Sequence, residues 1–86
     1  MVDDHRHVER DVTIVNTQGL HARPIGRFVD LAARFTCSIR IKKGELEVDG
    51  KSPMEMMLLE ATQGTVLRLV ASGEDALSAI DALESL

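Results

Sequence analysis

Apolar and polar residues alternate along four stretches of the chain, and this period of two predicts β-strands. The stretches are residues 8–15, 36–42, 45–48 and 65–71. Within each stretch, the apolar residues at alternate positions lie on one side of the predicted strand. These residues are Val8, Val12, Ile14, Cys37, Ile39, Ile41, Leu46, Val48, Leu67, Leu69 and Ala71. Arg10 is the exception, because it has the parity of Val8 and Val12. The "KKG" of residues 42–44 predicts a hairpin turn between the second and third strands.

Three other stretches have helical character. Residues 22–34 place Ile25, Phe28, Val29 and Ala32 at the spacing of one helix face. The last stretch, residues 72–86, has a stripe of Ala76, Ile80 and Leu83. Its Glu74 and Asp75 favour the positive end of the helix dipole.

The "KSPMEMMLLEA" stretch predicts a short helix over residues 53–60. Ser52 suits the N-cap and Pro53 the first helical position. Glu55, three residues after the cap, completes the sequence signature of a capping box.

The resulting order, β-α-β-β-α-β-α, predicts an α+β fold, an open-faced β-sandwich. Because the strands are apolar on one side, we expect a four-stranded antiparallel sheet with three helices on one face. Polar residues 1–7 are expected to be a flexible N-terminal tail, and residues 8–86 a single domain.

Charge and composition exclude several classes of protein. A net charge of −4 and only two aromatic residues argue against nucleic-acid binding. The single cysteine, Cys37, permits no internal disulfide, is expected in the core, and favours a reducing compartment. No segment resembles a signal peptide or approaches the roughly 20 apolar residues of a membrane helix. We therefore expect a cytoplasmic protein without membrane insertion.

The stretch "NTQGLHARPIGRF", residues 16–28, carries the candidate chemistry. His21 stands where a helix begins, so the backbone N–H groups of Ala22 and Arg23 and the helix dipole favour an anion such as phosphate there. A neutral imidazole is a nucleophile near neutral pH, and the Arg23 guanidinium neutralises phosphate oxygens. The pattern by itself also fits a histidine that is merely a polar cap or a surface side chain, since capping is a common role for polar residues at a helix start. His5 and His7 would need two more metal ligands, and none is evident nearby, so no metal site is expected.

The motif "GLHARP" at residues 19–24 resembles the active-site motif of HPr, the histidine-containing phosphocarrier of the bacterial sugar phosphotransferase system. The resemblance spans residues 9–86 and includes "GKS" at 50–52, "TQGT" at 62–65 and "GED" at 73–75. It implies that His21 accepts a phosphoryl group on its δ nitrogen from phosphorylated enzyme I and passes it to an enzyme IIA domain. Arg23 matches the arginine that assists the phosphorylated histidine in this family. Such a carrier is not a stand-alone turnover enzyme and needs no cofactor.

The resemblance also suggests a second phosphorylation site. Ser52 matches the serine that HPr kinase modifies in some branches of the family, but Pro53 follows it where an aliphatic residue is usual. The candidate docking residues for partner proteins are Leu20, Arg27, Met54 and Met57. Three methionines at 54, 56 and 57 cannot all face inward on one helix, so exposed methionines are expected to form part of this surface.

Two alternatives to a monomeric sugar-system carrier remain at this point. One is a regulatory binding module that signals through phosphorylation of Ser52 or His21, including the nitrogen-related branch of the phosphotransferase system. The other is a plain ligand-binding domain, for which the sequence has no pocket-forming signature.

Overall fold

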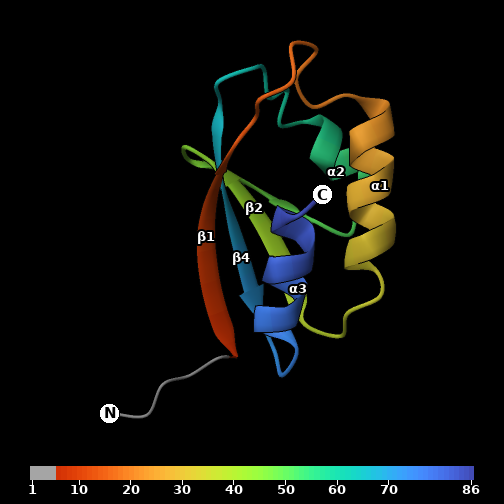
Figure 1. The fold of residues 1–86 in the computed structure, drawn as a ribbon, viewed down its shortest axis with the longest axis vertical. Helices are drawn as coiled ribbons and strands as arrows, with labels where there is room; N and C mark the ends of the chain where they lie inside the picture. The colour runs from red at the N-terminus through yellow and green to blue at the C-terminus, as the bar shows by residue number, and fades with distance from the viewer. Residues whose placement is uncertain (1–5) are drawn as a thin grey trace.

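A computed structural model describes residues 6–86, which form a four-stranded antiparallel sheet with three helices on one face (Figure 1). The strands are β1 (His7–Thr13), β2 (Ser38–Lys43), β3 (Leu46–Asp49) and β4 (Val66–Ser72). The helices are α1 (Ala22–Ala32), α2 (Pro53–Met57) and α3 (Ala76–Glu84). The predicted element order and fold class are confirmed. No helix in this part of the chain is long and apolar enough to cross a membrane.

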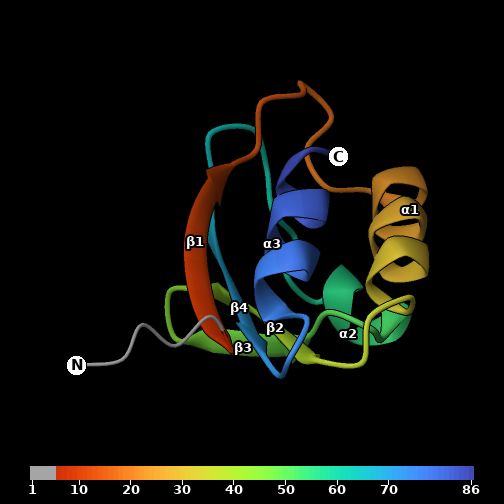
Figure 2. The same cartoon turned by 60° about the horizontal axis from the view of Figure 1, so that its bottom comes forward.

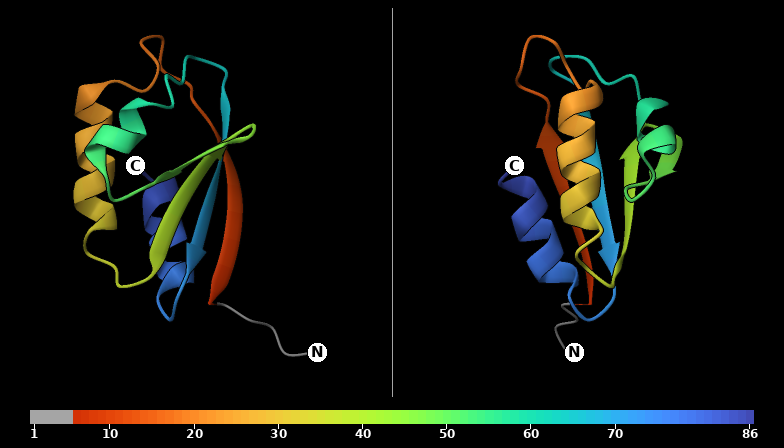
Figure 3. Two further views of the ribbon diagram at one scale, coloured as in Figure 1. Left: turned by 180° about the vertical axis from the view of Figure 1, so that it is seen from behind. Right: turned by 90° about the vertical axis from the view of Figure 1, so that its right-hand side faces the viewer.

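The strands lie in the order β1-β4-β2-β3, so the first strand is next to the last. Strand β4 pairs with both β1 and β2, whereas β1 and β3 form the two edges. The views from behind and from the side show α1, α2 and α3 on the same side of this sheet (Figure 3).

The core lies between the sheet and the helices. Figure 2 shows these two layers with the bottom of the molecule turned forward. The predicted inward positions of β2 and β4 are all nearly inaccessible to solvent. These positions are Cys37, Ile39, Ile41, Leu67, Leu69 and Ala71. The helices add Ile25, Ala32, Met56, Ala76, Ala79, Ile80 and Leu83. Leu46, predicted to be inward, is 40% exposed because it lies at the end of the edge strand β3.

Arg10 keeps the parity of its apolar neighbours and faces the helices from the sheet edge. Its Nη1 atom lies 3.0 Å from Oδ1 of Asp81 and 2.9 Å from Oε1 of Glu84, both on α3. An edge position lets the guanidinium reach these carboxylates without entering the core. Arg10, the exception in the apolar pattern of this strand, therefore links β1 to α3 through ion pairs.

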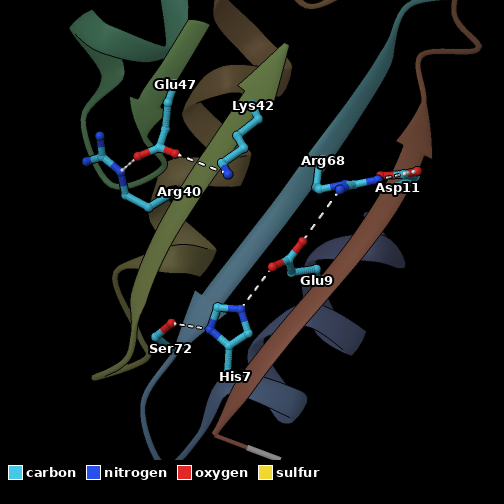
Figure 4. A network of polar contacts seen from close by, with 8 residues as sticks. All are labelled: His7, Glu9, Asp11, Arg40, Lys42, Glu47, Arg68 and Ser72. Atoms are coloured by element: carbon cyan, nitrogen blue, oxygen red, sulfur yellow. Dashed lines mark hydrogen bonds and ion pairs between the residues drawn. The ribbon is translucent and has the colours of Figure 1, made fainter. Parts of the chain in front are cut away.

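The other face of the sheet carries polar side chains that bond one another across strands (Figure 4). Arg68 Nε lies 2.8 Å from Oδ1 of Asp11, and Arg68 Nη1 lies 3.6 Å from Oε1 of Glu9. His7 contacts Oε2 of Glu9 and Oγ of Ser72, each at 2.9 Å. Arg68 on β4 thus compensates the charges of Asp11 and Glu9 on β1, on a face that no helix covers.

Several element ends differ from the predicted ones. Strand β1 begins at His7, which was predicted to be in the tail, and residues 1–5 lie outside the described part of the chain. Helix α1 ends at Ala32 rather than at residue 34, and α2 ends at Met57 rather than at residue 60. The hairpin loop consists of residues 44 and 45, where Gly44 has a φ of 59°. Helix ends are set by tertiary contacts that a local pattern does not contain.

The predicted capping box at α2 is half correct. Ser52 is the N-cap, and its side chain accepts a hydrogen bond from the Glu55 N–H at 3.2 Å. The Glu55 carboxylate does not return to Ser52; it accepts from the Asp49 N–H at 3.1 Å. The Ser52 N–H is already used, because it donates to the Asp49 carbonyl at 3.1 Å.

Candidate functional site

His21 is the N-cap residue of α1, with an extended backbone (φ −120°, ψ −173°). Its carbonyl accepts from the Ile25 N–H at 3.0 Å, and its exposed side chain makes no capping hydrogen bond. Pro24 has no N–H. The N–H groups of Ala22 and Arg23 have no helical acceptor, because no helical residue lies four positions before them. The imidazole and two amide donors lie at the positive end of the helix dipole, which favours a bound anion.

The loop before α1 is stabilised by its own hydrogen bonds. Asn16 donates from Nδ2 to the Gly19 carbonyl at 2.7 Å, and the Gly19 N–H donates to the Asn16 carbonyl at 3.1 Å. Gly19 has a φ of 69°, in the left-handed region. The composition of residues 16–19, "NTQG", is typical of a turn, but it does not show that the Asn16 side chain closes that turn.

A second loop, residues 60–65, supports the first one from β4's side (Figure 1). The Leu20 N–H donates to the Ala61 carbonyl at 2.8 Å, and the Gly64 N–H donates to the Ile14 carbonyl at 2.8 Å. A Cβ atom on Gly19 would lie 2.5 Å from the Ala61 carbonyl oxygen, so only glycine fits there. The "TQG" of residues 62–64 has the composition of a turn, but the contact of this loop with the histidine loop depends on tertiary structure.

Two arginines follow His21 on α1. Arg23 and Arg27 are four residues apart, so they lie on one side of the helix, and both are exposed. Neither guanidinium forms an ion pair with another described residue. The first turn of α1 has no acidic residue. Positive charge is thus concentrated beside the imidazole.

Only part of the predicted site is brought together in one place. Leu20, His21, Arg23 and Arg27 line a common recess. Ser52, Met54 and Met57 do not line it, and buried Met56 is the α2 residue that does. That short helix packs against α1 (Figure 1).

The three methionines of α2 separate as the helical period requires. Met56 is buried in the core at 1% exposure, whereas Met54 and Met57 are 81% and 57% exposed. Leu58 is also 61% exposed and was not predicted as part of this surface. We name Met54, Met57 and Leu58 the α2 apolar patch. Exposed methionines suit an adaptable protein-docking surface.

Of the two histidines at which no metal site is expected, His5 lies outside the described residues. His7 is bonded to Glu9 and Ser72 on the open face of the sheet. Across residues 6–86 there is no group of three or more His, Cys, Asp or Glu side chains arranged to hold a metal ion.

Comparison with known proteins places these features in a family. Residues 8–86 match the family model described as PTS HPr component phosphorylation site. The chain is 44% identical over 78 residues to the phosphocarrier protein HPr of Pseudomonas putida, covering 90% of this chain and 87% of that protein. It is 38% identical over 79 residues to the phosphocarrier protein NPr of Shewanella violacea, covering 92% and 87%. The structure of HPr-C-His from Thermoanaerobacter tengcongensis superimposes with a TM-score of 0.88 at 42% identity, covering 92% and 89%.

Proposed function

The chain belongs to the HPr family of phosphocarrier proteins of the phosphotransferase system, and on this premise we propose that His21 carries the phosphoryl group. The observation that supports this choice most strongly is the exposed His21 side chain at the start of α1, which makes no capping hydrogen bond. A histidine that served only as a cap would use its side chain to satisfy the first turn.

The chemistry follows from this position. The lone pair of the δ nitrogen of a neutral His21 attacks the phosphorus of the donor, and a nitrogen–phosphorus bond forms as the donor's bond to phosphorus breaks. The Ala22 and Arg23 N–H groups donate to phosphoryl oxygens, and the Arg23 guanidinium neutralises their charge. Transfer to the acceptor reverses these steps. The carrier returns to the neutral imidazole.

We further propose phosphorylated enzyme I as the donor and an enzyme IIA domain as the acceptor. Leu20 and Arg27 lie close to His21 in the chain, and the α2 apolar patch lies on the neighbouring helix. Together they offer a cationic and an apolar element for docking. One surface then serves donor and acceptor in turn, which suits a carrier that releases each partner after transfer.

The assay mixes the protein with phosphoenolpyruvate, magnesium and enzyme I, and locates added phosphate by mass spectrometry at neutral or alkaline pH. We expect one acid-labile phosphate, absent from a folded His21→Ala variant. The matched control is His7→Ala, which removes an exposed histidine from the open face of the sheet. Phosphorylation of His21→Ala at the wild-type level would refute the proposal.

The role of Arg23 has its own test. An Arg23→Gln variant keeps the backbone N–H and loses the charge. Removing one stabilising donor from a reacting centre costs on the order of a hundredfold in rate. We expect a loss of this order in the rate of His21 phosphorylation, measured by rapid quench. Arg34→Gln, an exposed arginine beyond the end of α1, is the control and is expected to react normally.

A regulatory function at Ser52 is the second candidate, and the position of Ser52 as the N-cap of α2 favours it. Ser52 begins α2, where phosphate would gain from the helix N-terminus but would lie beside the Glu55 carboxylate. Incubation with an HPr kinase and ATP tests this function. Acid-stable phosphate that is lost in Ser52→Ala would support it, and unmodified wild-type protein would oppose it.

A further inference from the structure

An apolar recess of about 570 Å³ opens beside His21, between the first half of α1, the end of β1 and the C-terminal end of α3. Its walls include the half-buried side chains of Val12, Ile14 and Phe28. Its floor includes the buried core residues Ile41 and Leu69. This volume lies within the range of small-molecule sites, which are mostly apolar with few polar groups.

The charged groups at the rim of the recess are two arginines and one glutamate. Arg23 and Arg27 line the recess from α1, and neither has an ion-pair partner among the described residues. Glu84 lines it from α3, and its Oε1 lies 2.9 Å from the Arg10 guanidinium, which also pairs with Asp81 and so offsets only part of that charge. Two guanidinium groups, those of Arg23 and Arg27, face this single carboxylate. The uncompensated charge at the mouth is therefore positive.

We propose that this recess binds an aliphatic carboxylate, with its alkyl chain along Val12, Ile14 and Phe28 and its carboxylate at Arg23 and Arg27. An apolar cavity without charge would accept any alkyl chain, and two arginines without a cavity would accept any anion. Their combination selects an amphipathic anion. A guanidinium binds a carboxylate through two parallel N–H donors, which fixes the head group at the mouth.

The proposal goes beyond phosphoryl transfer and uses a different surface from the α2 apolar patch. It has one consequence for the carrier function, which depends on the proposed role of His21. A carboxylate held at Arg23 occupies the guanidinium that would otherwise neutralise the phosphoryl group. Bound ligand would then slow phosphorylation of His21.

The direct test needs no phosphorylation. Decanoate, below the concentration at which it self-associates, is titrated into the unmodified protein while methyl resonances are followed by NMR. We expect saturable shifts of Val12, Ile14 and Leu83, which line the recess. Shortening the chain from decanoate to octanoate should weaken binding by up to about fourfold per buried methylene.

Head-group selectivity is tested with decyltrimethylammonium, which has the same tail and the opposite charge, and with acetate, which has no tail. Neither should shift the recess methyls at the concentration where decanoate saturates. Equal shifts with the ammonium compound would overturn the proposal, because the surface would then be merely apolar. Decanoate shifts confined to the α2 apolar patch would also overturn it, as would binding only to anionic phosphatidylglycerol vesicles.

Two variants locate the site. Arg27→Gln should weaken decanoate binding about tenfold by removing one charge-assisted pair, whereas the control Arg34→Gln should bind normally. Val12→Phe should abolish binding by filling the recess. If Val12→Phe does not fold, judged by its amide spectrum, the Arg27 and Arg34 pair still decides the question. Equal affinity in that pair refutes the proposed head-group site.

Discussion

The Asp75 side chain links the start of α3 to the segment that leads into β2. Its Oδ2 accepts from the Thr36 N–H at 2.8 Å, and its Oδ1 accepts from the Cys37 N–H at 2.9 Å. The sequence position of Asp75 predicts only a favourable interaction with the helix dipole, and its side chain makes no capping hydrogen bond on its own helix. Hydrogen bonds to the ionised carboxylate, that from the Thr36 N–H foremost, lower the pKa of Asp75 to about 2.

Asp75 should make stability depend on acidity. Because its folded pKa lies below the ordinary value of 3.8, its contribution is present above pH 3.8 and is lost as pH falls toward about 2. Asp75→Asn should be less stable than wild type at pH 7 and less sensitive to pH in that acid window. Urea unfolding at a series of pH values measures this. The control is Asp30→Asn, an exposed carboxylate on α1; an equal flattening there would contradict the assignment.

Cys37 is the buried neighbour of this carboxylate, and only 2% of its surface is exposed. Burial, together with Asp75, raises the pKa of the Cys37 thiol to about 11. Only about one thiol in ten thousand is then ionised at pH 7. We expect a disulfide reagent such as dithionitrobenzoate to react slowly with the native protein and completely in denaturant. Immediate reaction of the native protein would show that the thiol is accessible.

At the scale of an element, α2 is stabilised by its surroundings rather than by its length. Five residues are too few for an independent helix. Pro53 begins it, Ser52 caps it, and Met56 and Leu59 anchor it in the core. The chain then leaves through Glu60, whose φ of 46° is left-handed. This conformation directs the chain into the loop whose Ala61 carbonyl binds the Leu20 N–H.

The conformation of Glu60 predicts a stabilising substitution. A left-handed residue with a side chain costs about 1–2 kcal/mol, and glycine recovers this at the expense of about 0.5–1 kcal/mol in unfolded-chain entropy. Glu60→Gly should therefore raise the free energy of unfolding by about 0.5–1 kcal/mol. Urea unfolding at pH 7 measures it. A destabilised Glu60→Gly variant would mean that the Glu60 side chain contributes more than its backbone costs.

The opposite substitution, in which a left-handed glycine is replaced by alanine, serves as the comparison with Glu60→Gly. Gly19→Ala places a Cβ atom 2.5 Å from the Ala61 carbonyl oxygen at a φ of 69°. The two loops would have to separate, so the same unfolding experiment should show a loss of stability. If Gly19→Ala were neutral, the contact between the loops would not be tight.

At the scale of the whole molecule, the sheet is a layer with helices on one face and paired charges on the other (Figures 3 and 4). Strand β4 is paired on both sides and its inward residues are buried. The edge strands are paired on one side within this layer. Stability should consequently be greatest around β4 and β2 and least at the periphery.

Native-state hydrogen exchange tests this distribution. The slowest amides should be those of β4 and β2, because exchange there requires both sides of the ladder or the core to open. Amides of α2 should exchange fastest among the helices, since it has only five residues. Protection in β3 that exceeds protection in β4 would show that the sheet does not unfold from its edges.

Much of the candidate site was visible in the sequence because its elements are contiguous. Residues 19–24 specify a turn, a helix start, an imidazole and a guanidinium within six positions. The residues that support this loop were not visible, because Ala61 lies forty positions after His21 and carries no distinctive side chain. Its contribution is a backbone carbonyl, which every residue has. The recess beside His21 was equally hidden, since residues of six helices and strands line it.

The sequence by itself determined which side of each element is buried, because side-chain direction repeats every two residues in a strand and every 3.6 in a helix. Ile39 and Leu69 face the core for this reason. Only the tertiary structure decided that β4 lies between β1 and β2, that Arg10 binds α3, and that Glu55 bonds to Asp49. Such choices depend on which distant groups meet and which donors are already taken, and no local period contains that information.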